Sequence, residues 1–239
     1  SEVFLAQIEK AKFTEPSEIQ EKTIPLALAG KDIIGGSATG SGKTLAFGAG
    51  IIEKTEKGKG IQALILTPTR ELAEQITKVL CIFSAYKMLR IAAIYGGVGI
   101  NPQISALEHA EIVVATPGRA LDHLERGTIN LTKVRTLVLD EADRMLDMGF
   151  IDDVEKIISL CPKERQTLLF SATISTEVTR LSSRYMKDPV EISVISYVDA
   201  SKLKQVFYDV PKEIKFSLLV HLLKNEQGGL IMVFCNTRD

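Results

Sequence analysis

The chain has 239 residues and a mass of 26.2 kDa, with 45% hydrophobic residues, 25% charged residues and a formal net charge of −1. This composition is typical of a folded protein and excludes collagen-like, low-complexity and wholly disordered chains. The 29 basic and 30 acidic residues balance, so bulk charge gives no attraction for nucleic acid and any such binding must come from local geometry.

Membrane-spanning and disulfide-bonded classes are also disfavoured. The longest stretch without a charge, residues 91–107, contains Gly96, Gly97, Gly99 and Pro102, whereas a bilayer span needs about 20 mainly apolar residues. The amino terminus lacks the basic and then apolar order of a secretory signal. The three cysteines lie far apart, which argues against a disulfide framework or a zinc site and favours the reducing cytoplasm.

Short apolar runs alternate with segments of helical period, the pattern of βαβ units around a mainly parallel sheet. Strands are expected at residues 32–35, 62–67, 91–95, 111–115, 136–139, 167–170 and 190–194. The last run alternates apolar and polar residues, which suits an edge strand. Helices are expected at residues 17–29, 43–54, 70–83, 100–107, 119–126, 151–160 and 176–186. The sequence therefore predicts an α/β domain whose parallel sheet is flanked by helices.

The alternation loosens near residue 195, and a shorter α/β pattern follows. It consists of a strand-like, a helix-like and a second strand-like run at residues 203–210, 213–224 and 230–234. About 40 residues are too few to close a core of their own. We therefore expect part of a longer protein, with a first domain at 1–195, a linker at 196–202 and the truncated start of a second domain at 203–239.

A loop of small residues follows the first expected strand and opens a helix. It comprises Ser37, Ala38, Thr39, Gly40, Ser41, Gly42, Lys43 and Thr44. Backbone N–H groups of such a loop can turn inward to hold phosphate oxygens, while the lysine reaches the β- and γ-phosphates and the threonine hydroxyl ligates Mg²⁺. The alternative is a glycine-rich turn that binds nothing. The Gly-Lys-Thr ending between a strand and a helix favours phosphate binding, although Ser37 stands where the strict pattern has Gly.

Two acids, Asp140 and Glu141, stand where the buried apolar run 136–139 ends. An Asp at this point of a phosphate-loop enzyme helps to hold Mg²⁺, and a neighbouring carboxylate can orient or deprotonate the attacking water. The alternative is that Asp140 merely caps the helix that follows. In an α/β chain that also carries Lys43, the pair favours a metal site.

Polar clusters also follow four other expected strands. They are Thr69 with Arg70, Gly96 with Gly97, Thr116 with Gly118 and Arg119, and Ser171 with Thr173. The carboxyl ends of parallel strands meet at one edge of a sheet, so these clusters should converge on one rim. Thr69 and Thr116 can cap helices, and the arginines add charge beside unpaired N–H groups. Each cluster alone could be no more than a helix cap, but their repetition on one edge favours a binding rim.

These motifs, in this order, resemble those of the DEAD-box ATP-dependent RNA helicases, and Asp140, Glu141, Ala142 and Asp143 spell the family's name. The resemblance runs from Phe13 to about Asn236, nearly the whole chain. It implies a RecA-like fold and an ATPase that uses ATP and Mg²⁺ to separate short RNA duplexes or remodel RNA–protein complexes. It also implies that RNA is held mainly by its sugar-phosphate backbone, with little base reading.

The resemblance also implies roles for single residues. Phe13 would stack on adenine and Gln20 would bond its edge, Ser37 to Thr44 would hold the phosphates, Asp140 would hold magnesium with Thr44, and Glu141 would activate water. Contacts to the RNA backbone would come from Thr69, Arg70, Gly97, Thr116, Gly118 and Arg119. Asp143, Ser171 and Thr173 would couple the state of the bound nucleotide to the strength of RNA binding. Val233, Phe234, Cys235 and Asn236 resemble the first motif of the family's second RecA-like domain.

The chain also departs from the family pattern. Lys12 and Ser37 stand where the family usually has Gly and Ala, and Ser17 with Gln20 fits a capping box that would use the same amide. The second-domain arginines that reach the γ-phosphate are not present, and such arginines contribute about 10³–10⁵ in rate in related enzymes. We expect the 239-residue chain to be a monomer that binds nucleotide with little turnover.

Two other functions remain open at this stage. The chain could belong to an ATP-gated RNA clamp that hardly turns over, although a clamp does not need the carboxylate of Glu141. It could also belong to a DNA-translocating helicase on the same fold. The adenine-reading segment and the Ser171-Ala172-Thr173 cluster favour RNA, but only through the resemblance.

Overall fold

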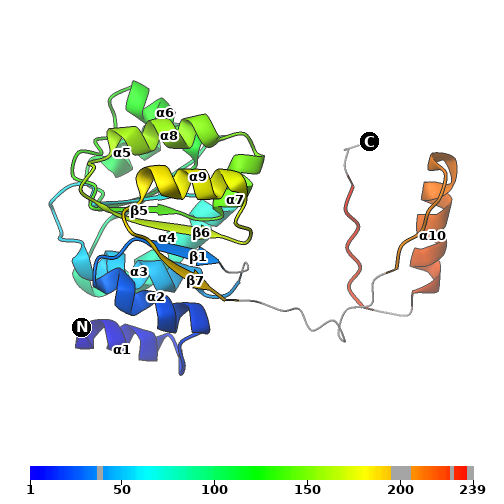
Figure 1. Cartoon of the computed structure of the whole chain (residues 1–239), viewed down its shortest axis with the longest axis horizontal. Coiled ribbons are helices and arrows are strands. Elements are labelled where there is room, and N and C mark those ends of the chain that lie inside the picture. The colour runs from blue at the N-terminus through cyan, green and yellow to red at the C-terminus, as the bar shows by residue number, and fades with distance from the viewer. Residues whose placement is uncertain (37–39, 195–205, 227–228, 236–239) are drawn as a thin grey trace. The chain divides into compact units, whose positions relative to one another are not determined.

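The computed structural model describes residues 1–36, 40–194, 206–226 and 229–235 (Figure 1). The chain divides into two compact units, Ser1–Ser196 and Tyr197–Asp239, which are described separately. The predicted linker at 196–202 and the phosphate-loop residues Ser37, Ala38 and Thr39 lie outside the described residues.

The first unit is built on seven parallel strands in the order β3-β4-β2-β5-β6-β1-β7. Their bounds are β1 Ile33–Gly36, β2 Ala63–Leu66, β3 Ile91–Ile94, β4 Ile112–Ala115, β5 Thr136–Leu139, β6 Gln166–Ser171 and β7 Val190–Ser193. Each strand lies within one residue of its predicted bounds, and β7 lies at an edge. The predicted α/β fold class is thus confirmed.

Helices cover both faces of this sheet (Figure 1). Their bounds are α1 Glu2–Lys10, α2 Glu18–Leu28, α3 Lys43–Lys54, α4 Arg70–Ser84, α5 Asn101–Leu107, α6 Pro117–Glu125, α7 Ala142–Asp147, α8 Ile151–Leu160 and α9 Thr176–Tyr185. The predicted helices agree closely with α2 to α6, α8 and α9. The sequence does not predict α1, because that helix buries only Phe4 and so shows no apolar stripe of its own.

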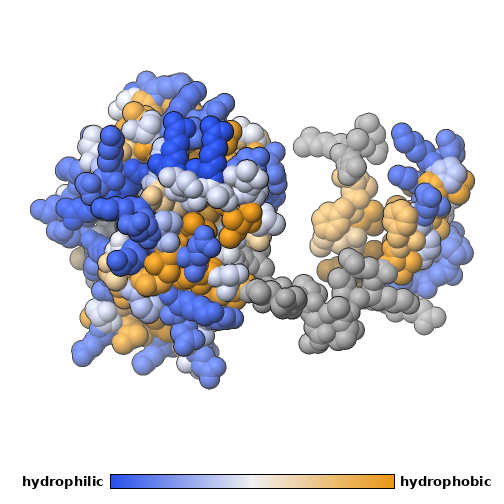
Figure 2. All heavy atoms as spheres, in the orientation of Figure 1, coloured by the Kyte–Doolittle hydropathy of each residue, from blue (hydrophilic) through white to orange (hydrophobic). Residues whose placement is uncertain are grey.

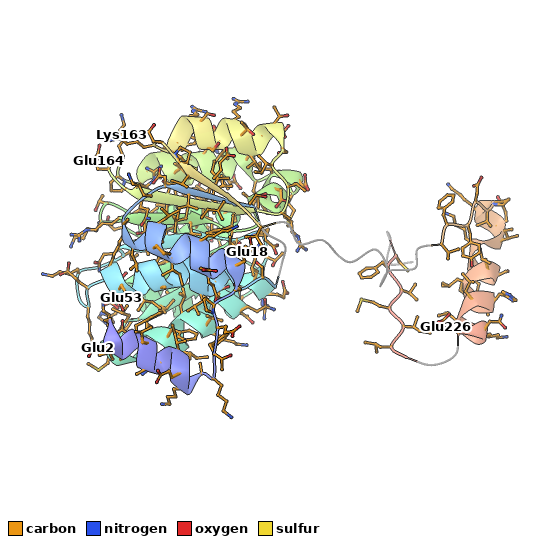
Figure 3. The ribbon with its side chains drawn as sticks, turned by 60° about the horizontal axis from the view of Figure 1, so that its bottom comes forward. Glu2, Glu18, Glu53, Lys163, Glu164 and Glu226 are labelled. Carbon is orange, nitrogen blue, oxygen red and sulfur yellow. The ribbon has the colours of Figure 1, made fainter. Side chains whose placement is uncertain are left out.

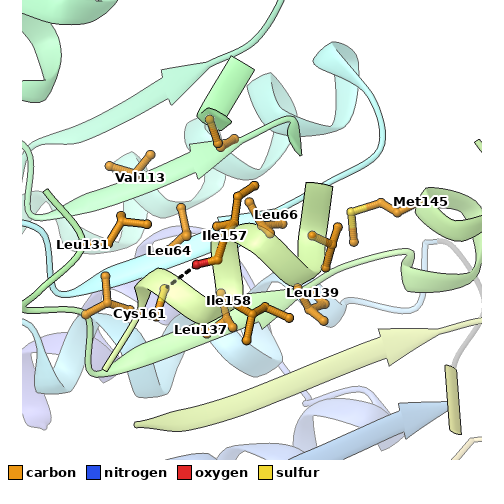
Figure 4. Packing of buried hydrophobic residues seen from close by; sticks show 14 of the residues in the cluster. Leu64, Leu66, Val113, Leu131, Leu137, Leu139, Met145, Ile157, Ile158 and Cys161 are labelled. Atoms are coloured by element: carbon orange, nitrogen blue, oxygen red, sulfur yellow. Dashed lines mark hydrogen bonds between the residues drawn. The ribbon is translucent and has the colours of Figure 1, made fainter. Parts of the chain in front are cut away.

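Alternate residues of each strand enter opposite layers of the core. In β2, Leu64 and Leu66 pack beneath α6, α7 and α8, whereas Ala63 and Ile65 pack against α2, α3 and α4. Figure 4 shows part of the first layer, where the Cys161 thiol also donates to the Ile157 carbonyl. Burial of one such aliphatic side chain stabilises the fold by about 1.5–3 kcal/mol, so two covered faces fix the sheet firmly.

A polar contact ties α1 to this body. Glu53, near the end of α3, accepts hydrogen bonds of 2.8 Å from the Ser1 hydroxyl and from the Tyr86 hydroxyl, and it lies beside α1 in Figure 3. Phe4 of α1 adds ring contacts to Phe83 and Tyr86. The helix is therefore held by one carboxylate and one aromatic cluster rather than by a long apolar face.

The strand order separates the predicted functional loops into two neighbouring groups. The loops after β1, β5 and β6 carry the phosphate loop, the acidic pair and the Ser171 cluster, and these strands are neighbours. The loops after β2, β3 and β4 carry the predicted RNA contacts, and these three strands are neighbours too. Since all strands are parallel, both groups open on the same edge. They meet where β2 pairs with β5.

The second unit differs from the sequence prediction. Its helix is present as α10, Lys215–Asn225, preceded by the 3₁₀ turn η3, Lys212–Ile214. The strands predicted at 203–210 and 230–234 are not strands in the described residues 206–210 and 229–235. A strand needs a hydrogen-bonded neighbour, and that described stretch offers none. Apolar side chains therefore stay exposed beside α10 (Figure 2), with Leu230 at 95% and Phe234 at 88% exposure.

None of the helices in the described ranges has the length and apolar character of a membrane span.

Candidate functional site

One cavity of about 590 Å³ brings together most of the predicted nucleotide-binding residues, although Ser41 is not in its lining and residues 37–39 lie outside the described ranges. Its polar lining includes Gln20, Gly40, Gly42, Lys43, Thr44, Gln75, Asp140 and Glu141, and its apolar lining includes Phe13, Leu72, Val79, Ile82 and Phe83. The first group comes from the ends of β1 and β5 and from α2 and α4. The structure therefore brings together residues that stand far apart in the sequence.

Lys43 and Asp140 form the charged floor of this cavity. The Lys43 ammonium lies 3.9 Å from Asp140 Oδ1, and the two residues are only 6% and 2% exposed. Burial raises the pKa of Asp140 to about 6, although the Lys43 charge and the hydrogen bond from the Glu141 amide oppose this rise. A buried carboxylate with so perturbed a pKa is typical of a functional site.

Glu141 begins α7 from a left-handed backbone conformation, with φ 51° and ψ 51°. A residue with a side chain adopts this region at a cost of about 1–3 kcal/mol, and such strain concentrates at functional sites. The Glu141 side chain lines the cavity, and its Oε2 lies 3.4 Å from Arg144 Nη1. The sharp turn lets the chain present Asp140 and Glu141 from consecutive positions to the same cavity.

The amino end of α2 is bonded directly to the phosphate loop. The Ser17 hydroxyl donates to the Ser41 carbonyl at 2.8 Å, and Gln20 Nε2 donates to the Gly42 carbonyl at 3.1 Å. Gln20 Oε1 also accepts from the Ser17 amide at 3.0 Å, so the predicted capping contact is present. Bonding to adenine would use the second hydrogen of Nε2 or the second lone pair of Oε1.

Gly42 shows why this loop needs glycine. Its φ is +93°, and a Cβ atom there would lie 2.5 Å from Gln20 Nε2 and 3.0 Å from Ser17 Oγ. Only glycine combines the left-handed backbone with room for those two side chains. The glycine thus lets Ser17 and Gln20 of α2 contact the phosphate loop directly.

One wall of the cavity was missed by sequence reasoning. Leu72, Gln75, Val79, Ile82 and Phe83, all on α4, face the cavity. Their spacing of three to four residues was visible as an amphipathic pattern, but that pattern is equally typical of a helix that packs only on the core.

Phe13 lies at the outer end of this wall. It is 49% exposed, and its ring centroid lies 6.0 Å from that of Phe83. The family resemblance implies that Phe13 stacks on adenine, and the structure leaves one part of the ring accessible beside the cavity.

The three predicted coupling residues contact one another. Asp143 Oδ2 accepts from the Thr173 amide at 2.9 Å and from its hydroxyl at 2.8 Å, and Ser171 Oγ accepts from the Asp143 amide at 3.3 Å. Burial alone would raise the pKa of Asp143, but the hydrogen bonds from Thr173, Arg144 and Ser171 lower it below its ordinary value. This cluster joins the end of β6 to α7, directly beside the acidic pair.

The six predicted RNA contacts line the neighbouring rim. Thr69 caps α4 by accepting from the Leu72 amide at 3.3 Å, and Arg70 is about half exposed. Gly97, with φ +81°, and Gly118 are exposed, with no atom near the position of a Cβ. Thr116 precedes Pro117 at the start of α6.

Arg119 is the exception on this rim. Its side chain is only 12% exposed, and Nη2 donates to the Val98 carbonyl at 3.1 Å while Nε lies 3.7 Å from Asp122. Part of the guanidinium is therefore already engaged with the protein, on the loop that carries Gly97.

Residues 17–181 match the DEAD/DEAH box helicase family. The whole chain is 45% identical to the DEAD-box ATP-dependent RNA helicase CshA of Geobacillus kaustophilus and 46% identical to a probable ATP-dependent RNA helicase of Methanocaldococcus jannaschii. It covers 52% and 64% of those proteins, respectively. The crystal structure of a DEAD box protein from the hyperthermophile Methanococcus jannaschii matches 94% of this chain with a TM-score of 0.80 and 46% identity, over 61% of that chain. The chain thus spans about half to two thirds of the length of these relatives.

Proposed function

Because the chain belongs to the DEAD/DEAH box helicase family, we propose that it is the ATP-binding and RNA-binding part of an ATP-dependent RNA helicase. The observation that carries this proposal is the single cavity in which Gln20, Lys43, Thr44, Asp140 and Glu141 meet. It opens on the same sheet edge as the rim of predicted RNA contacts. The complete protein would hydrolyse ATP and use the energy to separate short RNA duplexes or to remodel RNA–protein complexes.

In this proposal Lys43 and the loop amides bind the phosphates, while Phe13 and Gln20 take the adenine. The Thr44 hydroxyl and the Asp140 carboxylate would hold Mg²⁺, which prefers oxygen ligands and takes its remaining ligands from phosphates and water. When bound, the ion would neutralise charge that develops on the transferred phosphoryl group.

Glu141 is the proposed water-orienting carboxylate. It is a cavity residue next to Asp140, and its Arg144 contact restrains the carboxylate. A general base must lie within hydrogen-bond reach of the proton that it takes, and a position beside the phosphates meets that need. Glu141→Gln keeps the size of the side chain and removes its charge. In the complete protein, this change should abolish turnover and retain ATP-dependent RNA binding.

RNA would lie across the rim formed after β2, β3 and β4, held by phosphates and 2′-hydroxyls. Arg70 supplies a half-exposed cation there, and Gly97 and Gly118 are exposed, with no atom near the position of a Cβ. A chain with a net charge of −1 can bind RNA this way because only one rim needs donors. Sequence preference should be weak, since backbone contacts carry no base information. The Asp143–Thr173 bonds, which join the loops after β5 and β6, would transmit the state of the bound nucleotide.

We propose that this chain alone is a monomer with little turnover. Among the described cavity residues, Lys43 is the only Lys or Arg, whereas fast phosphoryl transfer in related enzymes needs an added arginine. Residues 203–239 would begin a second RecA-like domain that follows the linker at 196–202. The free thiols of Cys81, Cys161 and Cys235 support a reducing compartment, for which we propose the cytoplasm.

The test is ATP hydrolysis by the complete protein, with matched single-stranded RNA or DNA as activator. The proposal predicts that RNA stimulates hydrolysis and DNA does not. Equal stimulation by both would favour the DNA-translocating alternative, and ATP-dependent RNA binding without hydrolysis would favour the clamp. Wild type and Glu141→Gln are compared in parallel, so that loss of turnover can be separated from loss of binding.

A further inference from the structure

We infer that Tyr95, Gln103 and His123 are positioning residues that lock the three RNA-facing loops into one preformed rim. This inference rests on the proposed function, since it assigns the rim to RNA. The three residues join the loops after β2, β3 and β4 through side chains that lie behind the rim. They act through the loops, not through contact with the nucleic acid.

His123, on α6, starts the chain of contacts. It is completely buried, its Nδ1 lies 2.7 Å from Thr128 Oγ1, and its Nε2 lies 3.2 Å from Gln103 Oε1. Because a glutamine oxygen can only accept, Nε2 is assigned the hydrogen, which leaves Nδ1 as an acceptor facing the Thr128 hydroxyl, whose single hydrogen it shares with the His123 carbonyl at 3.1 Å. Burial lowers the pKa of His123, which agrees with this neutral form.

Gln103, in α5, is hydrogen-bonded to the start of the loop that carries Gly96 and Gly97, here called the glycine loop. It is 6% exposed, and its Nε2 donates to the Tyr95 carbonyl at 3.0 Å. Tyr95 immediately precedes Gly96 and Gly97. The loop is held a second time by α6, because Arg119 Nη2 donates to the Val98 carbonyl. One anchor of the glycine loop, Arg119, therefore lies on α6 itself, and the other, Gln103 of α5, is bonded to His123 of α6.

The Tyr95 side chain carries the connection in the other direction, to α4. Its hydroxyl donates to Glu74 Oε1 at 2.6 Å, and the Arg70 guanidinium lies over its ring at 5.1 Å from the centroid. Arg70 Nε also lies 3.3 Å from Glu74 Oε1. The direction of the Arg70 guanidinium is thus set by the residue that opens the glycine loop.

These contacts are more than packing. Gln103 and His123 are buried polar residues where apolar side chains would satisfy a core equally well, and buried polar groups are tolerated only when they are paired. A fully paired polar network fixes one geometry, because any shift leaves a donor or acceptor unsatisfied. Strand pairing alone sets the ends of β2, β3 and β4, but it does not set the loops beyond them. The network performs that second task.

The test compares Gln103→Leu with Gln62→Leu. Gln62 is a matched control, because it is also buried, at 4% exposure, and its amide bonds the Glu56 and Gly60 carbonyls at the opposite edge of the sheet. Three properties are measured for each variant of the chain: amide hydrogen exchange of residues 96–100, affinity for a fluorescent single-stranded oligouridine, and affinity for a fluorescent ADP.

Gln103→Leu should speed exchange in residues 96–100 and weaken oligouridine binding by about threefold to thirtyfold, the loss expected for one or two hydrogen bonds. ADP affinity should stay unchanged, and Gln62→Leu should change neither rim property. Tyr95→Phe, which removes only the hydroxyl bond to Glu74, should show the same RNA effect in a milder form and serves if Gln103→Leu does not fold. Unchanged exchange at 96–100 in the folded variants, or an equal change in Gln62→Leu, would overturn the inference. If the wild-type chain binds no RNA at all, the proposed function fails instead, and the exchange data still decide whether the network exists.

Discussion

Two aspartates three positions apart should respond to neutralisation with opposite signs. Asp140 is 2% exposed, and burial raises its pKa from 3.8 to about 6, so ionised Asp140 destabilises the ligand-free fold at neutral pH. Asp143 accepts both bonds from Thr173, and its pKa is lowered in the fold, so ionised Asp143 stabilises it. Asp140→Asn and Asp143→Asn each remove one charge and keep the shape of the side chain.

The magnitude for Asp140 follows from its pKa. A rise from 3.8 to about 6 corresponds to about 3 kcal/mol at neutral pH. The Lys43 ammonium lowers the pKa and thus already offsets part of the burial cost. Asp140→Asn should therefore stabilise the metal-free chain by up to about 3 kcal/mol, or roughly 6–12 °C in Tm for a unit of this size. Asp143→Asn should destabilise it by about 1 kcal/mol, since charged hydrogen bonds become neutral ones and solvent screens part of the charge.

The assay is thermal unfolding at about pH 7.5 with a chelator present, well above both ordinary carboxyl pKa values. The sign follows from proton linkage: between pH 3.8 and about 6 the folded chain holds a proton on Asp140 that the unfolded chain releases, so stability falls as pH rises through that range. Nucleotide binding with Mg²⁺ should be lost in Asp140→Asn despite its higher Tm. A Tm for Asp140→Asn at or below that of wild type would refute this reasoning.

Three further changes have outcomes that follow from single contacts. Gly42→Ala should lower stability by about 1–3 kcal/mol and abolish binding of a fluorescent ADP, because the new Cβ would clash with Gln20. Gly40→Ala is the control and should keep more binding, because no atom lies within 4 Å of the position of its Cβ. The Cys161 thiol is buried and has a pKa of about 11, so iodoacetamide at about pH 8 should modify it only on unfolding, as mass spectrometry of the native and denatured chain would show. Burial lowers the pKa of His123, so stability should fall as the pH drops below about 6.5, and His123→Gln should reduce that loss in a Tm series against pH.

Much of the first unit could be predicted because its signals are local. Short, mainly apolar runs such as 63–66 and 136–139 are typical of strands buried on both faces, and the polar residues beyond them mark where the strands end. The phosphate loop and the acidic pair could be placed together for the same reason, since parallel strands carry both to one edge. Helix α1 could not be predicted, because its place depends on Glu53 and an aromatic cluster rather than on its own pattern.

The directions and partners of individual side chains could not be predicted from the sequence. The contact of Arg119 with RNA stays a prediction, but the sequence did not reveal that its Nη2 donates to the Val98 carbonyl, a partner 21 positions away. Gln20 serves both its own helix and Gly42, which a helix-cap pattern alone does not reveal. The strands expected at 203–210 and 230–234 failed because a strand depends on a neighbour that the local pattern cannot supply.

Titration of the chain with a fluorescent ADP in the presence of Mg²⁺ tests most directly whether the cavity binds nucleotide. The wild-type chain should show saturable binding that Lys43→Ala weakens by more than about tenfold, the loss expected for a charged contact to phosphate. Lys54→Ala is the matched control, because Lys54 ends the same helix and bonds the Ala27 carbonyl and Gln166 away from the cavity. Equal affinity of wild type and Lys43→Ala, or an equal loss in Lys54→Ala, would contradict the proposed nucleotide site.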